Sequence, residues 1–125
     1  MGDRANVVMR ENGSPDLFLY THWGGSDLLE TVRTALQRRL RWDDTSYLAR
    51  IVFCQMIKGQ EDQETGYGIS TYPPDNEHDF IVLNVDAQCV EIWSENRNGE
   101  SRFGKKLKST TFKDFAKEAV KSRAA

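Results

Sequence analysis

The sequence predicts an α+β domain with a mainly antiparallel sheet of about five strands and three helices packed on one face. Short apolar segments occur in pairs separated by turn residues, which is typical of β-hairpins. Helical patterns are grouped instead of alternating with the strands, which indicates α+β and not α/β. The chain of 125 residues fits one domain, residues 1–125, and its 38% hydrophobic content is that of an ordinary globular protein.

The first hairpin comprises residues 5–9 and 17–21. The intervening residues 12–16 hold Asn, Gly, Ser, Pro and Asp, which favour a turn. Apolar residues then recur at helical spacing over residues 27–40, and Ser26 is placed to cap this helix. We expect the arginines of this helix and its end to form a solvated basic face: Arg33, Arg38, Arg39 and Arg41.

A second, mostly buried helix is predicted over residues 47–58. Residues 42–46 supply its capping side chains and Gly59 ends it. The β-branched content is also compatible with a strand, but the length and the caps favour a helix. Cys54 on this segment and Cys89 form no CxxC pair, and we expect both to be buried reduced thiols.

The C-terminal half predicts further strands and a last helix. Residues 66–72 form a strand entered through glycines, and residues 80–86 pair with 89–93 in a second hairpin. A short strand near Phe103 is compatible with the pattern. Thr111-Phe-Lys-Asp114 matches a capping box that starts the final amphipathic helix.

The best candidate site lies where the second strand runs into a glycine turn: His22, Trp23, Gly24, Gly25 and Ser26. Glycines permit close approach of the backbone, and a helix beginning at Ser26 directs N–H groups at whatever sits there. Trp23 offers a stacking surface and His22 a hydrogen bond. These residues predict a site for a small anionic ligand. A purely structural turn is the alternative, because Asp27 and Glu30 already satisfy the helix dipole.

Three residues elsewhere are candidates for the other walls of the same cleft. Tyr67 and Tyr72 flank the strand at residues 66–72, and Arg50 places a cation on the second helix, where it needs a partner. The alternative is that the tyrosines pack in the core or at its rim and that the partner of Arg50 is structural.

Several functions have no support in the residues. The segment Asp75, Glu77, His78 and Asp79 lacks metal-ligand spacing, and no nucleophile motif is present, so we expect neither a metal, a cofactor nor a catalytic residue. A formal charge of −2 argues against general nucleic-acid binding. No apolar run is long enough to cross a membrane and no secretion signal is visible, so a cytoplasmic location is expected.

Four stretches resemble a group of small hypothetical proteins encoded by bacteria and their phages, over roughly residues 17–93: Tyr20-Thr-His-Trp-Gly-Gly25, Arg41-Trp-Asp-Asp44, Tyr47-Leu-Ala-Arg-Ile51 and Glu64-Thr-Gly-Tyr-Gly-Ile-Ser-Thr71. The resemblance implies a phage or prophage setting. Small proteins of that setting often act without catalysis, by masking a host protein or by sequestering a nucleotide signal used in defence.

The sequence therefore leads to two hypotheses. The first is a non-enzymatic protein that holds a small anionic, nucleotide-like ligand around the His-Trp-Gly-Gly turn and counters host defence. The second is an interaction module or inhibitor that presents a host macromolecule with the acidic loops at residues 61–64 and 75–79, or with the basic helix face. An enzyme with His22 as general base ranks third, and an apolar open sheet face would favour a homodimer.

Overall fold

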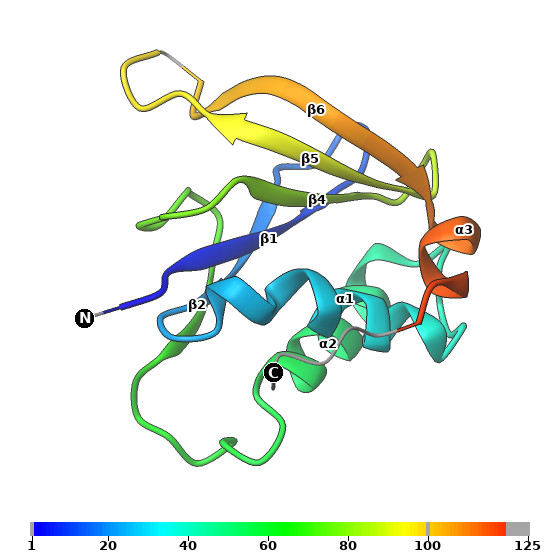
Figure 1. Ribbon diagram of the computed structural model, residues 1–125, viewed down its shortest axis with the longest axis horizontal. Coiled ribbons are helices and arrows are strands. Elements are labelled where there is room, and N and C mark those ends of the chain that lie inside the picture. The colour runs from blue at the N-terminus through cyan, green and yellow to red at the C-terminus, as the bar shows by residue number, and fades with distance from the viewer. Residues whose placement is uncertain (1, 100, 120–125) are drawn as a thin grey trace.

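The computed structural model describes residues 2–99 and 101–119, which form one mixed sheet and a layer of helices (Figure 1). The strands are β1 (Ala5–Arg10), β2 (Leu17–Thr21), β3 (Tyr67–Ser70), β4 (Phe80–Asn84), β5 (Cys89–Glu95) and β6 (Phe103–Thr111). The helices are the 3-10 turn η1 (Gly25–Asp27), α1 (Leu28–Gln37), α2 (Thr45–Met56) and α3 (Phe112–Lys117).

The sheet confirms the α+β class and corrects its finer description. The strand order is β3-β2-β1-β4-β5-β6, so the sheet has six strands and not about five. All neighbouring pairs are antiparallel except β1 and β4, which run parallel in the centre with Val8 opposite Val82. After β2 the chain forms α1 and α2, then the edge strand β3, and then β4, which pairs with β1. Hairpin patterns alone do not reveal the long-range pairing of β1 with β4.

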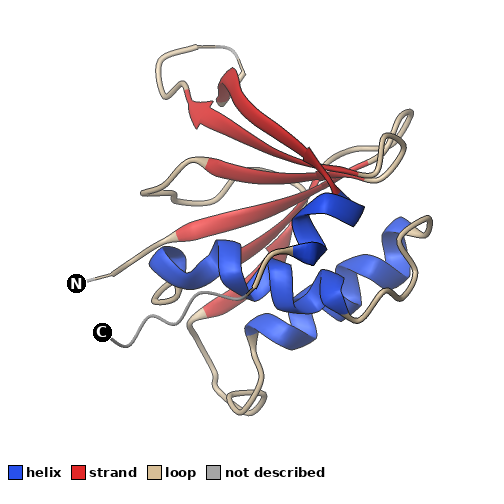
Figure 2. Cartoon of the chain, turned by 45° about the vertical axis from the view of Figure 1, so that its right-hand side comes forward, coloured by secondary structure: helices blue, strands red, loops and turns tan. Residues whose placement is uncertain are grey.

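The three α-helices of the described residues lie on one face of the sheet, as predicted (Figure 2). Alternate strand residues face them, and Val7, Leu19 and Leu83 meet Val32, Leu36 and Leu48 of α1 and α2 in the main core. The period of two along the strands and the helical spacing of the apolar side chains bring both sets into one cluster.

The boundaries and burial of the long helices differ from the expectation. The α-helix α1 ends at Gln37 because Arg39 and Arg41 have φ of 55° and 58°, which a right-handed helix excludes. Asp44 caps α2, with its side chain accepting a hydrogen bond from the Tyr47 N–H at 3.2 Å. Only one side of α2 is buried. Cys54 is exposed and Cys89 half-buried, so the expectation of two buried thiols is wrong.

The second face of the sheet is covered by the sheet's own curvature. Its buried residues Val8, Phe18, Phe80 and Val82 pack against Trp93 and Phe103. Phe103 of β6 stacks on Phe18 of β2 with ring centroids 6.2 Å apart, although three strands lie between β2 and β6. Strands in a flat sheet are spaced about 4.8 Å apart, so this contact requires a strongly coiled sheet, and irregular pairing of β5 and β6 near Trp93 supplies bending. The apolar open face considered for a homodimer is therefore absent from the described residues.

Arg33 fastens α3 to α1 and is not part of a solvated basic face. Its side chain is buried, Nη1 donates to the Phe115 carbonyl at 2.6 Å, and Nε lies 3.0 Å from Oε1 of Glu30. The guanidinium also lies over the Phe115 ring, 3.9 Å from its centroid, and 3.0 Å from the Glu118 carboxylate. The expectation of a solvated face is wrong for Arg33, whereas Arg38, Arg39 and Arg41 are exposed.

Candidate functional site

The His22–Ser26 turn is anchored by two hydrogen bonds that its backbone N–H groups donate, one to a side chain and one to the backbone. The Thr21 hydroxyl at the end of β2 accepts from the Gly24 N–H at 3.0 Å. The His22 N–H donates to the Gly66 carbonyl at 2.8 Å, which ties the turn to the residue before β3. The turn is thus held in one conformation next to the edge of the sheet.

The N–H groups at the start of η1 already have an anionic partner within the chain. The Gly25 N–H donates to the Asp3 carbonyl at 2.8 Å, and the Ser26 N–H donates to Asp3 Oδ2 at 2.8 Å. His78 Nε2 lies 2.5 Å from the other carboxylate oxygen. We call this group, Asp3, Gly25, Ser26 and His78, the N-terminal latch. The Asp3 carboxylate occupies the position that the sequence assigned to a bound anion.

Glycine is required at residue 25 by this internal contact. A Cβ atom there would lie 2.6 Å from the Asp3 carbonyl oxygen and 2.7 Å from the His78 ring. Both distances are shorter than van der Waals contact, so any larger residue would push the first strand and the 75–79 loop away from the turn. The close approach that glycine permits is therefore made by the chain itself.

The latch shifts the titration of Asp3. The hydrogen bond with His78, followed by that from the Ser26 N–H, lowers the pKa of Asp3 to about 2 from its usual 3.8. Because the pKa is lower in the folded state, the ionised carboxylate stabilises the fold above pH 3.8 and loses this contribution as the pH falls through about 2.

Asp3→Asn is therefore expected to lower the Tm at neutral pH, with the difference from the native protein disappearing in acid. Thermal melts of both proteins from pH 7 down to about pH 2 measure this convergence. Asp62→Asn, in the exposed 60–65 loop, is the matched control and should alter the Tm little. A gap between Asp3→Asn and the native protein that stays constant down to the acid end would show that the Asp3 charge does not stabilise the latch.

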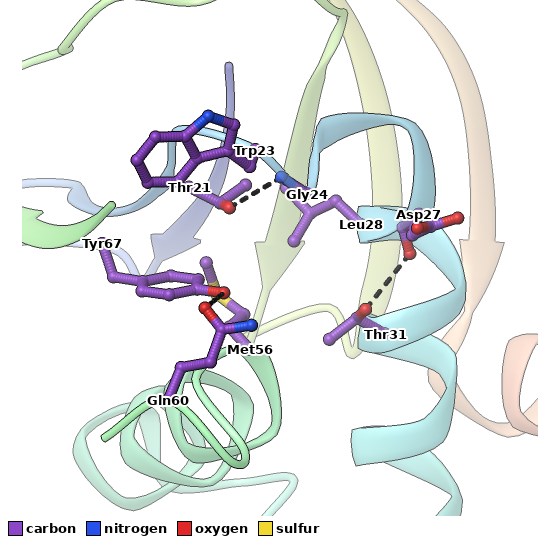
Figure 3. A pocket seen from close by; sticks show the side chains of 9 residues that line it. All are labelled: Thr21, Trp23, Gly24, Asp27, Leu28, Thr31, Met56, Gln60 and Tyr67. Atoms are coloured by element: carbon purple, nitrogen blue, oxygen red, sulfur yellow. Dashed lines mark hydrogen bonds between the residues drawn. The ribbon is translucent and has the colours of Figure 1, made fainter. Parts of the chain in front are cut away.

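A cleft of about 290 Å³ opens on the other side of the same turn, facing α1 and the end of α2 (Figure 3). We call it the Trp23 cleft. Its lining residues come from the turn, both long helices, the following loop and β3: Thr21, Trp23, Gly24, Asp27, Leu28, Thr31, Met56, Gln60 and Tyr67. Trp23 and Tyr67 lie on the same side of the opening, and α1 forms the opposite wall (Figure 3).

Trp23 is exposed and yet firmly positioned. Its side chain is 56% exposed, and its ring meets the His22 ring edge-on with centroids 4.4 Å apart. His22 is in turn fixed by the Tyr20 hydroxyl, 3.0 Å from Nδ1. Gly66, with a φ of 100°, lies against the indole, and a Cβ there would be 2.6 Å from its Cζ3 atom. The indole is therefore held at the mouth of the cleft by its neighbours without being buried.

The candidate residues predicted from sequence are divided among four places: the Trp23 cleft, the latch, the exposed side of α2 and a hollow beside Tyr72. Trp23, Gly24 and Tyr67 line the Trp23 cleft, and His22 supports the indole. Gly25 and Ser26 belong to the latch and border a second hollow of about 380 Å³.

Two of the expected walls lie elsewhere. Arg50 is exposed on α2 and does not line the Trp23 cleft. Tyr72, 70% exposed, borders a shallow hollow beside Tyr20, Gly68 and Pro74. The structure therefore brings together the turn and Tyr67, and it leaves Arg50 and Tyr72 apart from them.

Four polar lining residues were not predicted as site residues from the sequence: Thr21, Asp27, Thr31 and Gln60. Thr31 lies one helical turn after Asp27 and lines the cleft, and its hydroxyl donates to the Asp27 carbonyl at 3.2 Å (Figure 3). Gln60 accepts a hydrogen bond from the Tyr67 hydroxyl at 3.1 Å. The helical spacing of Asp27 and Thr31 was a usable signal, whereas no local pattern pairs Thr21 or Gln60 with them.

The acidic loop at residues 75–79 is a structural element. Glu77 accepts from the Arg4 N–H at 2.9 Å and pairs with its guanidinium, and His78 belongs to the latch. Asn76, which is buried, donates to Glu95 at 3.3 Å. Within residues 2–99 and 101–119, no group of histidine, cysteine, aspartate and glutamate has the arrangement of a metal site.

Comparison of the chain with protein-family models, curated proteins and solved structures finds no match. The kinship with bacterial and phage proteins therefore stays a prediction. Among the described residues, no helix is both long and apolar enough to span a bilayer.

Proposed function

We propose that this protein binds a small ring-bearing molecule in the Trp23 cleft and does not transform it. The observation that carries the proposal is the exposed indole of Trp23, held by His22 and Gly66 at the mouth of an open cleft. Exposing a large apolar ring costs solvation free energy, and a rigidly held aromatic side chain gives stacking area with little loss of entropy on binding. The cleft volume is at the lower end of that of small-molecule sites.

The lining favours a neutral or positively charged ligand over an anion. The residues that line the cleft include no lysine or arginine, and Asp27 adds a carboxylate. The turn N–H groups that would receive a phosphate are bonded to Asp3. The sequence predicted a nucleotide-like ligand. We therefore expect the cleft to bind the ring and sugar of such a molecule, and we do not expect a phosphate to be its main anchor.

Hydrogen-bonding groups around the rings would supply specificity. Thr21 and Thr31 contribute hydroxyls and Gln60 an amide, each able to meet a ring edge or a sugar hydroxyl. In the phage setting implied by the resemblance, sequestering such a molecule is a route to counter host defence, and it needs no catalytic residue.

Calorimetric titration with adenosine and cytidine, and with their 5′-monophosphates, tests the proposal. We expect the nucleosides to bind more tightly than the monophosphates. Trp23→Ala should weaken binding about tenfold or more, since stacking on an aromatic residue is worth about 1–3 kcal/mol. The Tm should change little, because most of the indole surface is already in solvent.

Tyr47→Ala is the matched control, because Tyr47 is a comparably exposed aromatic residue, at 49%, on a different surface. It should leave binding unchanged. Tighter binding of the monophosphates, or binding that survives Trp23→Ala, would contradict the proposed site. A large fall in the Tm of Trp23→Ala would mean that the indole is structural.

A further inference from the structure

The two edges of the sheet are protected differently. The edge strand β6 carries the exposed lysines Lys105, Lys106 and Lys108, and such charges discourage pairing with another strand. The opposite edge strand β3 carries no charged residue, and its Ile69 is 58% exposed. Within residues 2–99 and 101–119, no backbone or side-chain group donates to or accepts from the outer edge of β3.

The loop that leads directly into β3 is acidic. Residues 60–65 are exposed and hold three carboxylates and no lysine or arginine: Glu61, Asp62 and Glu64. Exposed Tyr72 follows the strand at its other end.

We propose that β3 is a docking edge for an extended, basic segment of a partner protein, which adds to the sheet as a seventh strand. Main-chain hydrogen bonds to β3 supply affinity with little dependence on sequence, as in other cases of strand addition. Ile69 and Tyr72 supply apolar contact, and the 60–65 loop selects lysine or arginine and speeds association. The proposal does not rest on the ligand of the Trp23 cleft, although Tyr67 of β3 also lines that cleft.

The charge distribution also disfavours a second copy of the chain as the occupant. Pairing β3 with β3 of another copy would place two acidic 60–65 loops at one short interface, and like charges at an interface oppose association. A basic segment meets no such repulsion.

The test uses two fluorescent octapeptides, one alternating valine with lysine and the other alternating valine with glutamate. Anisotropy titrations are expected to show binding of the lysine peptide that weakens as salt is added, and no binding of the glutamate peptide. Ile69→Lys places on β3 the kind of charge that β6 already carries, and it should weaken binding about tenfold or more.

Leu107→Lys is the matched control, because Leu107 is an equally exposed apolar residue, at 56%, on the β6 edge. Leu107→Lys should leave peptide binding unchanged. Trp23→Ala should also leave it unchanged, which would show that the peptide does not bind through the Trp23 cleft. Combined Glu61→Gln, Asp62→Asn and Glu64→Gln should reduce both the affinity and its dependence on salt.

Four results would overturn the proposal. They are no binding of the lysine peptide at millimolar concentration, equal binding of the glutamate peptide, equal loss with Leu107→Lys, and a concentration-dependent dimer that Ile69→Lys abolishes. The last result would assign the edge to a second copy of the chain.

Discussion

Phe80→Ala is expected to lower the free energy of unfolding by about 3–5 kcal/mol, the range for removing a large aromatic side chain from a core. Phe80 has no exposed surface. It is the first residue of β4, the strand that lies between β1 and β5. Its ring meets Phe103 at 4.7 Å and Phe18 at 6.2 Å between centroids. Alanine would leave a cavity in the small cluster that joins both halves of the coiled sheet.

Urea denaturation followed by far-UV circular dichroism measures this change. Leu107→Ala, on the exposed outer strand β6, is the control and should change stability by about 0.5 kcal/mol or less. If Phe80→Ala also cost about 0.5 kcal/mol or less, the second face of the sheet would not be a packed core, and the curvature described for the sheet would be wrong.

Arg33→Ala is expected to destabilise the protein by about 2–4 kcal/mol, because it removes a buried guanidinium that is the shared partner of one buried carbonyl and two carboxylates. The Phe115 carbonyl would lose its donor, and Glu30 and Glu118 would lose a cation. Glu118 is half exposed and can be hydrated, which keeps the expected loss below that of a fully buried network.

Hydrogen exchange locates the effect. The amides of α3 should lose protection first in Arg33→Ala, since Arg33 and Gln37 hold the end of that helix to α1. Arg33→Lys should restore little, because a lysine cannot reproduce the planar fork of donors over the Phe115 ring. Arg38→Ala, which removes an exposed arginine, should have little effect. Equal losses in Arg33→Ala and Arg38→Ala would show that Arg33 does not fasten α3 to α1.

Local patterns in the sequence predicted most of the elements but not their long-range pairing. The hairpin of β1 and β2, the caps at Asp44 and Thr111 and the helical spacing of α1 are short-range signals, and each is present in the structure. The parallel pairing of β1 with β4 joins residues more than 70 positions apart, for which no local signal exists. Strand β6 was underestimated because its lysines interrupt the apolar alternation, as befits an edge strand.

The candidate site shows the same limit. The sequence singled out the His22–Ser26 turn by residue type. It did not reveal that the Ser26 N–H donates to the Asp3 carboxylate, or that His78, in the loop before β4, contacts the same carboxylate. Neither residue carries a motif. The sequence predicted a solvated position for Arg33 because the residue is charged. In the structure, partners at α3 and directly after it allow the side chain to be buried.

Two surfaces with different electrostatic character follow from this arrangement. Because Asp3 accepts the hydrogen bonds of the turn N–H groups, we place the proposed ligand in the aromatic cleft beside the turn. The interaction role expected from the charged loops stays a proposal, which we assign to the edge strand β3. Because variants at Trp23 and Ile69 act on separate residues, each role is open to test without disturbing the other.

The most direct test of the central claim is a ¹⁵N–¹H NMR titration with adenosine 5′-monophosphate, which carries both a ring and a phosphate. We predict that the largest shifts occur at the Trp23 indole and at the amides of Thr21, Thr31 and Tyr67, with Gly25 and Ser26 unmoved. Largest shifts at Gly25 and Ser26, with loss of the Asp3 contacts, would show that phosphate displaces the latch and that the turn is an anion site after all.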